Sequence, residues 1–538
     1  MSTPYDYDYI VIGSGFGGSV SALRLAEKGY DVGVLEQGKR FRCEDFPKTN
    51  WNLRKYLWMP KLRMFGFQAI SLLKDVLVFH GAGVGGGSLV YANTLPTPPS
   101  SAFRDTRWPT HDDWEARLAP FYDTARRMLG AVEAKNTYPT DELLREIVDV
   151  EMRAKDSFHR HQVGVYFGEA GETVPDPFFQ GEGPERTGCI ECGRCMSGCP
   201  HDAKNTLDKN YLYLAERLGA TVHPETKAVD VQSLTGGGYE VRTIRSTALL
   251  PGRPRVLRSK GVVFSASVLG TVPLLLGCKE RGSLAMLSDQ LGNFVRTNSE
   301  AILYATAHDD EVDYSKGIAI TSGVHPDEHT HVEMCRYGEG QDFMSLMGTV
   351  LTGGGEGLPR WLRWLGNVLR HPLLFLRSVI PFGWARRTGI ILVMQPLSSY
   401  MRLARTRGLL GTRVDSELVE GQKVPTYMPK ANEIAQCMAE KMGGDARSLL
   451  LEVVGNRSST AHILGGAIMG RSPEEGVCDA YGRVFGYDNM YVCDGSLVPA
   501  NLGVNPSLTI TALSEYVMHH VPPKEGADRR PAPRPQSR

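Results

Sequence analysis

The sequence has no excess of charge of either sign, few cysteines and no leader-like segment. Its 60 lysines and arginines balance 60 aspartates and glutamates, which gives no electrostatic basis for binding nucleic acid. Ten cysteines in 538 residues are too few for a disulfide scaffold. An apolar, strand-like run starts within about ten residues of Met1, which leaves no room for a secretory leader. We therefore expect a cytoplasmic protein.

The length and composition are typical of a soluble protein with more than one domain. Hydrophobic residues make up 42% of the chain and charged residues 22%. A chain of 538 residues is too long for a single core, so we expect two domains, each built from separated segments.

The N-terminal segment has the order strand, glycine turn, helix and second strand. Gly13, Gly15 and Gly18 have the G-x-G-x-x-G spacing, which lets the backbone turn tightly, admits a pyrophosphate and packs helix on strand. Glu36 ends the second strand, where a carboxylate can bind both ribose hydroxyls, so FAD or NAD is favoured over NADP. An ordinary glycine turn is the alternative. Because strand, helix and Glu36 are in register, we predict a dinucleotide site.

Two further segments indicate backbone close to a ligand. Residues 81–93 include five glycines, and so many residues without Cβ indicate a backbone pressed against a flat or bulky group. A flexible linker is the alternative. Near the C-terminus a strand ends in a turn at Asp494 and Gly495, and a helix begins at Pro506. The N-terminus of that helix is suited to a partly negative group.

Together these three segments resemble the glucose-methanol-choline (GMC) oxidoreductases, most closely their bacterial cholesterol oxidase branch. The resemblance implies an α/β fold, with a Rossmann-type FAD-binding domain and a second, mostly β-sheet, substrate-binding domain. We assign residues 1–100, 205–300 and 455–522 to the FAD-binding domain and residues 301–454 to the substrate-binding domain. Residues 101–204 would form a helical and cysteine-rich insert, and 523–538 a disordered tail.

The same resemblance implies roles for individual residues. Asp494 would hold the ribityl chain of FAD, and His462 and Asn505 would face the substrate near flavin N5. An imidazole suits removal of a hydroxyl proton, because its pKa lies near working pH, and Asn505 can bind the substrate oxygen without competing for that proton. The remaining cofactor contacts that we predict are Gly83, Gly86, Ser88, Asn93, Gly495 and Pro506, together with Asn505 itself.

The resemblance therefore implies oxidation of the hydroxyl of a sterol, or a similar bulky secondary alcohol, to the ketone. Hydride would pass to flavin N5, with oxygen or a redox protein as the final electron acceptor. Another lipophilic alcohol as substrate, or a flavin and iron-sulfur electron-transfer protein, are the alternatives. Glu333, Glu339 and Asp342 do not match the glutamate that isomerises the Δ5 bond in some relatives, so the sequence leaves isomerisation open.

Four cysteines, Cys189, Cys192, Cys195 and Cys199, have the ferredoxin spacing C-x2-C-x2-C-x3-C-P. The fourth cysteine of this pattern normally serves a second cluster, and the sequence has no second set. An iron-sulfur cluster and a zinc site are alternatives to cysteines without metal. We keep the iron-sulfur cluster as a candidate cofactor and predict no set of metal ligands.

Residues 359–387 combine tryptophans and leucines with six arginines and no acid. Pro372 and Pro381 exclude a single membrane-spanning helix, and the apolar run is too short for one. The segment could lie on anionic lipid, which would suit an enzyme that extracts a sterol from a bilayer. A helix packed into the protein with its arginines exposed is the alternative.

Overall fold

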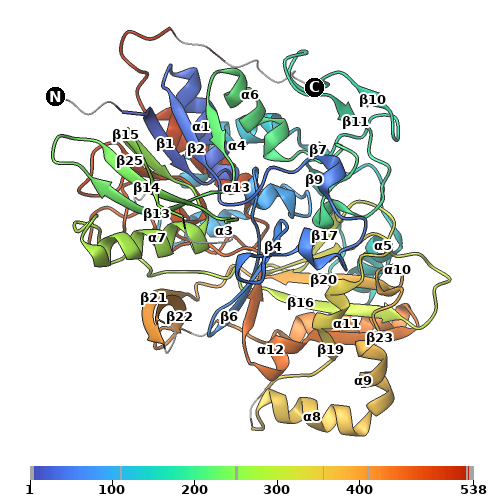
Figure 1. Ribbon diagram of the computed structural model, residues 1–538. Helices are drawn as coiled ribbons and strands as arrows, with labels where there is room; N and C mark the ends of the chain where they lie inside the picture. The colour runs from blue at the N-terminus through green and yellow to red at the C-terminus, as the bar shows by residue number, and fades with distance from the viewer. Residues whose placement is uncertain are drawn as a thin grey trace.

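Two seven-stranded β-sheets dominate the part of the chain that the computed structural model describes, and they lie one above the other (Figure 1). The structure describes residues 5–109, 112–248, 252–355, 357–408, 411–422, 424–528 and 531. Within these ranges, no helix has both the length and the apolar character needed to cross a bilayer.

The first sheet has a parallel half and an antiparallel half. Its strand order is β12-β2-β1-β15-β14-β13, and β25 pairs with the end of β15. Its strands are β1 (Tyr7–Ile12), β2 (Val32–Leu35), β12 (Thr221–His223), β13 (Thr226–Ser233), β14 (Tyr239–Arg245), β15 (Arg255–Phe264) and β25 (Met490–Val492). Five of the six residues of β1 are buried, as expected for a strand covered on both faces.

Helices from both ends of the chain pack around this sheet. They are α1 (Phe16–Glu27), α4 (Trp114–Met128), α6 (Tyr211–Arg217), α7 (Val268–Arg281) and α13 (Ser507–His519). Helix α1 contacts α6 and α13, and α13 also contacts α4. Eleven of the 13 residues of α13 are buried, so this helix lies inside the molecule, with its N-terminus fixed in position.

The second sheet is antiparallel, with the strand order β19-β23-β16-β20-β18-β17-β8. Its strands are β8 (His159–Arg160), β16 (Ala301–Ala307), β17 (Ile320–Asp327), β18 (Thr330–Cys335), β19 (Gly348–Val350), β20 (Thr388–Met394) and β23 (Gly444–Leu449). Alternate residues of each strand point to opposite sides, and apolar residues occupy both faces of this sheet. Leu303 and Val393 pack towards α11 (Pro429–Lys441), whereas Tyr304 and Leu392 belong to a separate cluster on the other face.

A small sheet joins two of the segments that the sequence singles out. It has the order β24-β6-β5, with β5 (Gln68–Leu72), β6 (Val76–Gly81) and β24 (Ser458–Thr460). Strands β6 and β24 pair in parallel, so the glycine-rich run after β6 and His462 after β24 leave the sheet in the same direction.

The other helices and strands are short or peripheral. The helices are α2 (Leu53–Tyr56), α3 (Ser100–Phe103), α5 (Pro139–Glu146), α8 (Arg360–Arg370), α9 (Pro372–Val379), α10 (Trp384–Arg387) and α12 (Leu450–Val454). The strands are β3 (Trp58–Met59), β4 (Met64–Phe65), β7 (Val132–Glu133), β9 (Gln162–Val163), β10 (Thr173–Val174), β11 (Arg186–Thr187), β21 (Met401–Gly408) and β22 (Gly411–Leu418).

This architecture confirms the predicted α/β fold, with a Rossmann-type domain and a second, mostly β-sheet domain. The strands of the first sheet come from the three segments 1–100, 205–300 and 455–522. The segment 101–204 is divided between the two halves, because α4 packs on α13 while β8 pairs with β17. Most of the tail 523–538 lies outside the described residues, but Lys524 pairs with Asp8 on β1 at 2.5 Å.

Candidate active site

One cavity extends from the glycine turn after β1 to the apolar face of the second sheet. Gly15, Phe16 and Gly17 line one end, where α1 begins. His462 and Asn505 line the cavity where it meets residues of the second sheet. The cavity therefore has a backbone-rich end suited to a dinucleotide and an apolar end suited to a substrate.

Close backbone contacts hold the three predicted segments together at the first end. A Cβ on Gly17 would lie 1.6 Å from the carbonyl oxygen of Cys493, in the turn that leads to Asp494. A Cβ on Gly86 would lie 2.6 Å from Cα of Gly15, and Gly86 has a φ of 53°. Only residues without side chains permit such contacts, so these glycines bring the N-terminal, second and C-terminal segments into one site.

Glu36 is buried at the edge of this end and already binds protein groups. Its carboxylate accepts hydrogen bonds from the Ser14 hydroxyl at 2.6 Å and from the Gly38 amide at 2.7 Å. The Ser14 hydroxyl in turn accepts a hydrogen bond from the amide of Gly85. Burial raises the pKa of Glu36, although these hydrogen bonds oppose the shift. Each carboxylate oxygen has more than one lone pair, so the ribose contact remains chemically open.

Several residues predicted to contact the cofactor lie behind the cavity wall. Ser88 binds the backbone at Gly85 and Leu207, and Asn93 is buried beside the Cys195 thiol. Their neighbours Gly87 and Tyr91 line the cavity instead. The predicted residues that are not part of the lining are Gly13, Gly18, Glu36, Gly83, Gly86, Ser88 and Asn93.

The C-terminal segment supplies the middle of the cavity. Asp494 and Gly495 line it, as do Pro506 and Ser507 at the start of α13. The Asp494 carboxylate accepts hydrogen bonds from Thr271 at 2.6 Å and from the Ser496 amide at 2.8 Å, which hold it in place. The free backbone N–H groups at the start of α13 give this part of the wall a partial positive charge.

His462 lies between a buried carboxylate and Asn505. Its Nδ1 contacts Oε1 of Glu300, whose side chain is fully buried. The other carboxylate oxygen of Glu300 accepts a hydrogen bond from the amide of Ala461 at 2.8 Å. On the opposite side of the ring, Nε2 lies 3.4 Å from Nδ2 of Asn505. Because the carboxylate favours a proton on Nδ1, the lone pair of Nε2 is directed towards Asn505.

The electrostatic surroundings make His462 more basic than an ordinary histidine. Burial by itself lowers the pKa of His462, but the Glu300 carboxylate raises it, with a further contribution from Glu333. The net effect is a raised pKa. His462 can therefore accept a proton from a hydroxyl, and Glu300 stabilises the resulting imidazolium.

The substrate end of the cavity has an apolar wall. Ile302 and Tyr304 of β16 line it, together with Ile390 and Leu392 of β20. These residues are on the face of the second sheet opposite α11, as the alternation along each strand requires. A wall of this kind is suited to a bulky apolar ligand.

Some residues at or next to the cavity were not predicted from the sequence. Glu300 stands alone before β16 without a motif, so only the folded structure brings it to His462. Ser265, Ser267 and Gly270 line the cavity between β15 and α7, a strand-to-helix turn. Such turns at the carboxyl ends of parallel strands commonly bind ligands, and the apolar run of residues 261–267 is the signal that could have identified this one.

The residues present fit FAD. The starts of α1 and α13 present backbone N–H groups, and α1 has no side-chain cap. Asn505 is buried, and its Oδ1 has no hydrogen-bond partner among the described residues, although such atoms are normally paired. A flavin and an alcohol would bring hydrogen-bonding groups into this space.

The four clustered cysteines lie around a second, small cavity. Cys189, Cys192, Cys195 and Cys199 all line it. Burial raises the pKa of Cys195 to about 11, so its thiol is protonated at neutral pH. In the described ranges, the groups with converging metal-ligand atoms consist of histidines and a glutamate, not of these cysteines.

Comparisons with known proteins agree with a cavity that binds FAD. The profile of the family described as GMC oxidoreductase matches residues 404–514, and that of an FAD binding domain matches residues 8–49. The chain is 46% identical to a cholesterol oxidase of Acinetobacter baumannii over 97% of this chain and 95% of that protein. It is equally identical to a cholesterol oxidase of Mycobacterium tuberculosis (strain ATCC 25618 / H37Rv), over 98% and 93% of the two chains.

Among solved structures, pyridoxine 4-oxidase from Mesorbium loti superposes with a TM-score of 0.61 at 14% identity. The alignment covers 96% of this chain and 99% of that one. At this level of identity, the likeness concerns the fold alone.

Proposed function

The chain belongs to the GMC oxidoreductase family, and we propose that it oxidises the hydroxyl of a sterol, or a similar bulky secondary alcohol, to the ketone in an FAD-dependent reaction. The observation that carries the proposal is the pair His462 and Asn505, which lines the same cavity as an apolar wall from the second sheet. Near full-length identity of 46% to cholesterol oxidases supports a sterol as substrate.

The chain's own side chains handle the proton of the alcohol. Asn505 donates a hydrogen bond to the substrate oxygen and holds the hydroxyl near Nε2 of His462. Nε2 accepts the hydroxyl proton, and Glu300 stabilises the charge that forms on the ring. FAD bound in the cavity would supply the acceptor, flavin N5, for the hydride of the carbinol carbon.

The apolar wall positions the substrate and keeps water away. Residues such as Ile302 and Leu392 contact a large hydrocarbon body without competing for its hydroxyl. Exclusion of water also strengthens the interaction between Glu300 and His462, because the local dielectric constant falls. Oxygen or a redox protein would then take up the two electrons.

Anaerobic mixing with different alcohols tests the substrate assignment. We expect a 3β-hydroxysterol to bleach the flavin absorbance of the holoenzyme, while a long-chain primary alcohol of similar carbon number does so much more slowly. If the primary alcohol bleaches the flavin and the sterol does not, the enzyme acts on another lipophilic alcohol.

Electron transfer through an iron-sulfur cluster is the second candidate function. The observation behind it is that Cys189, Cys192, Cys195 and Cys199 line one small cavity, although their sulfur atoms are not among the converging metal-ligand groups of the described residues. Analysis of the purified protein for iron and acid-labile sulfide decides the matter. Stoichiometric iron and sulfide with a brown absorbance shoulder support a cluster, and flavin absorbance alone excludes it.

We also propose that helices α8 and α9 and the loop to α10 rest on an anionic lipid bilayer. Figure 1 shows α8 and α9 projecting from the molecule below the second sheet. Leu369 is 73% exposed, Leu373 70% and Phe382 80%. Arg370 and Arg377 are also exposed, and residues 359–387 contain no acid. Exposed apolar side chains next to arginines match the chemistry of an anionic bilayer surface.

The position of these helices suits delivery of a sterol. Helix α9 packs against the short helix Phe343–Met347, and Met344 of that helix lines the active-site cavity. Arg360, in contrast, is buried and donates hydrogen bonds to the backbone, so it serves the fold rather than the surface.

Sedimentation with lipid vesicles tests this contact. We expect the protein to bind vesicles containing phosphatidylglycerol, and to bind pure phosphatidylcholine vesicles less. Leu369→Ser combined with Phe382→Ser should abolish binding, whereas Met286→Ser, at another exposed apolar residue, should not. Equal binding by all three proteins, or no binding by the wild type, would contradict the proposal.

A further inference from the structure

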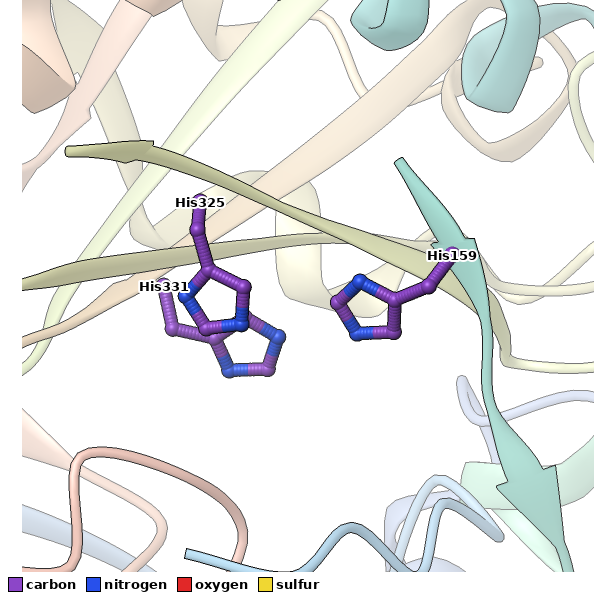
Figure 2. Close-up of side chains that lie close together, drawn as sticks. All are labelled: His159, His325 and His331. Atoms are coloured by element: carbon purple, nitrogen blue, oxygen red, sulfur yellow. The ribbon is translucent and has the colours of Figure 1, made fainter. Parts of the chain in front are cut away.

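Four histidines and a glutamate gather where β8, β17 and β18 lie side by side. His159 is on β8 and His161 follows it, His325 is on β17, and His331 and Glu333 are on β18. Figure 2 shows His159 approaching from its own strand towards His325 and His331. None of these residues lines the cavity of the active site.

The inner members, His161, His331 and Glu333, form a buried group. Their side chains are 2%, 3% and 0% exposed, and one potential ligand atom from each lies within 4.8 Å of the others. Polar side chains are rarely buried so completely unless they are paired or bind an ion.

Hydrogen bonding does not satisfy this group. Nε2 of His161 lies 2.9 Å from Oε1 of Glu333, yet neither atom meets hydrogen-bond geometry with any described residue. Both ring nitrogens of His331 also lack a hydrogen-bond partner in the described ranges. An ion pair between His161 and Glu333 would account for two members of the group, whereas Nε2 of His331 lies 4.0 Å from the same Oε1, too far for a hydrogen bond.

Gly323 on β17 provides the space for this arrangement. It pairs with Glu333 across the sheet, and a Cβ on it would lie 2.6 Å from Nε2 of both His161 and His331. The two nitrogens therefore converge over the one residue that has no side chain.

The ring orientations favour the inner group over the alternative group of His159, His325 and His331. A metal ion lies in the plane of each imidazole that binds it. The rings of His159, His325 and His331 are nearly parallel, with interplanar angles of 13–18°, so they cannot all point to one ion. The rings of His161 and His331 meet at 76°, which allows their planes to cross at a common position.

We propose that His161, His331 and Glu333 bind one zinc ion or a similar divalent transition-metal ion. Two imidazole nitrogens and a carboxylate are a ligand set that zinc accepts, with water or a fourth side chain completing the coordination. His159 and His325 lie on the solvent side and provide the route of entry, because His325 is exposed and His159 half-buried. The ion would link the chain after β8, the edge strand of the second sheet, to β18.

Metal titration of the holoenzyme tests the site. The full-length protein with FAD is treated with a chelator, dialysed and titrated with zinc chloride in a calorimeter. We expect one zinc ion per chain for the wild type and for His329→Ala. His329 is the matched control, because it is exposed in the turn of the same hairpin and outside the cluster.

Glu333→Gln and His331→Ala should each weaken zinc binding at least ~10–100-fold, the range seen when groups that support a metal site are removed. Flavin absorbance of each variant reports whether it is folded, and Glu333→Gln decides if His331→Ala fails to fold. A wild type that takes up no zinc, or folded variants that bind it as tightly as the wild type, would overturn the proposal.

Discussion

At His462 the two ring nitrogens have different neighbours, and in the proposed reaction this difference sets the direction of proton transfer. Nδ1 faces the Glu300 carboxylate, whereas Nε2 lies 3.4 Å from Asn505 in the cavity. The carboxylate both orients the ring and favours its charged form. In the proposed reaction His462 is the group that contacts the substrate, and Glu300 acts through it as a positioning residue.

Removing the imidazole should separate chemistry from cofactor binding. We expect His462→Ala to retain FAD but to be reduced by the alcohol at least ~100-fold more slowly, since a positioned base contributes about 10²–10⁴-fold. Anaerobic stopped-flow absorbance measures the rate. An unchanged rate of reduction would remove His462 from the mechanism.

Replacing Glu300 should shift the pH dependence of the reaction. His462 must be neutral to accept a proton, so kcat/KM rises with pH through its pKa, and the wild-type midpoint lies above that of an ordinary histidine. Glu300→Gln removes the main influence that raises this pKa and leaves burial, which lowers it, opposed only by the smaller contribution of Glu333. The midpoint should therefore move to lower pH.

The pH profile distinguishes this role from a purely structural one. A loss of kcat/KM with an unchanged midpoint in Glu300→Gln would mean that the carboxylate supports the fold and not the basicity of His462.

At the level of elements, the site depends on how closely α1 approaches the turn after β25. Gly17 touches the backbone of Cys493 there, although the G-x-G-x-x-G pattern does not include Gly17. The contact brings the start of α1 and Asp494 into the same cavity wall.

A side chain at this contact should disturb both the fold and the cofactor. Gly17→Ala places a Cβ 1.6 Å from a carbonyl oxygen, so α1 or the turn must move. We expect the free energy of unfolding to fall by about 1–3 kcal/mol, as for other overpacked sites, and FAD to dissociate more readily. Gly236→Ala is the control, because nothing lies within 4 Å of the added Cβ.

Release of FAD on dilution and thermal unfolding measure these effects. Equal FAD retention and stability in Gly17→Ala and Gly236→Ala would show that the contact can relax without consequence.

For the whole molecule, the cavity lies where the two sheets meet, so a ligand in it contacts both halves of the chain. Its lining includes the start of α1 next to the first sheet and the strands β16 and β20 of the second. FAD should therefore stabilise the contact between the two domains as well as the first domain itself.

Removing the cofactor tests this coupling. We expect the apoprotein to unfold at a lower temperature than the holoenzyme, and added FAD to restore the difference. A ligand at 100 times its Kd contributes about 2.7 kcal/mol to the free energy of unfolding. Calorimetry measures both forms, and an identical Tm would show that FAD does not stabilise the folded state.

The sequence by itself determined the family and the α/β fold, and it predicted His462 and Asn505, which lie together in the cavity. The dinucleotide unit is readable because its strand, glycine turn and helix are contiguous and each has a local signature. His462 and Asn505 are only 43 residues apart, in the most specific of the three segments. The prediction of individual contact residues was less precise at residues 81–93, because a glycine-rich run does not show which residues face the ligand.

Only the tertiary structure decided which side chains surround this pair. Glu300 accepts a hydrogen bond from an amide 161 residues away, and the histidine cluster combines residues from β8 and from the hairpin of β17 and β18. None of these residues belongs to a motif, so their separate positions in the chain carry no signal. They meet because strands distant in sequence become neighbours in the second sheet, and pairing between strands is set by packing of the whole domain, not by local residue patterns.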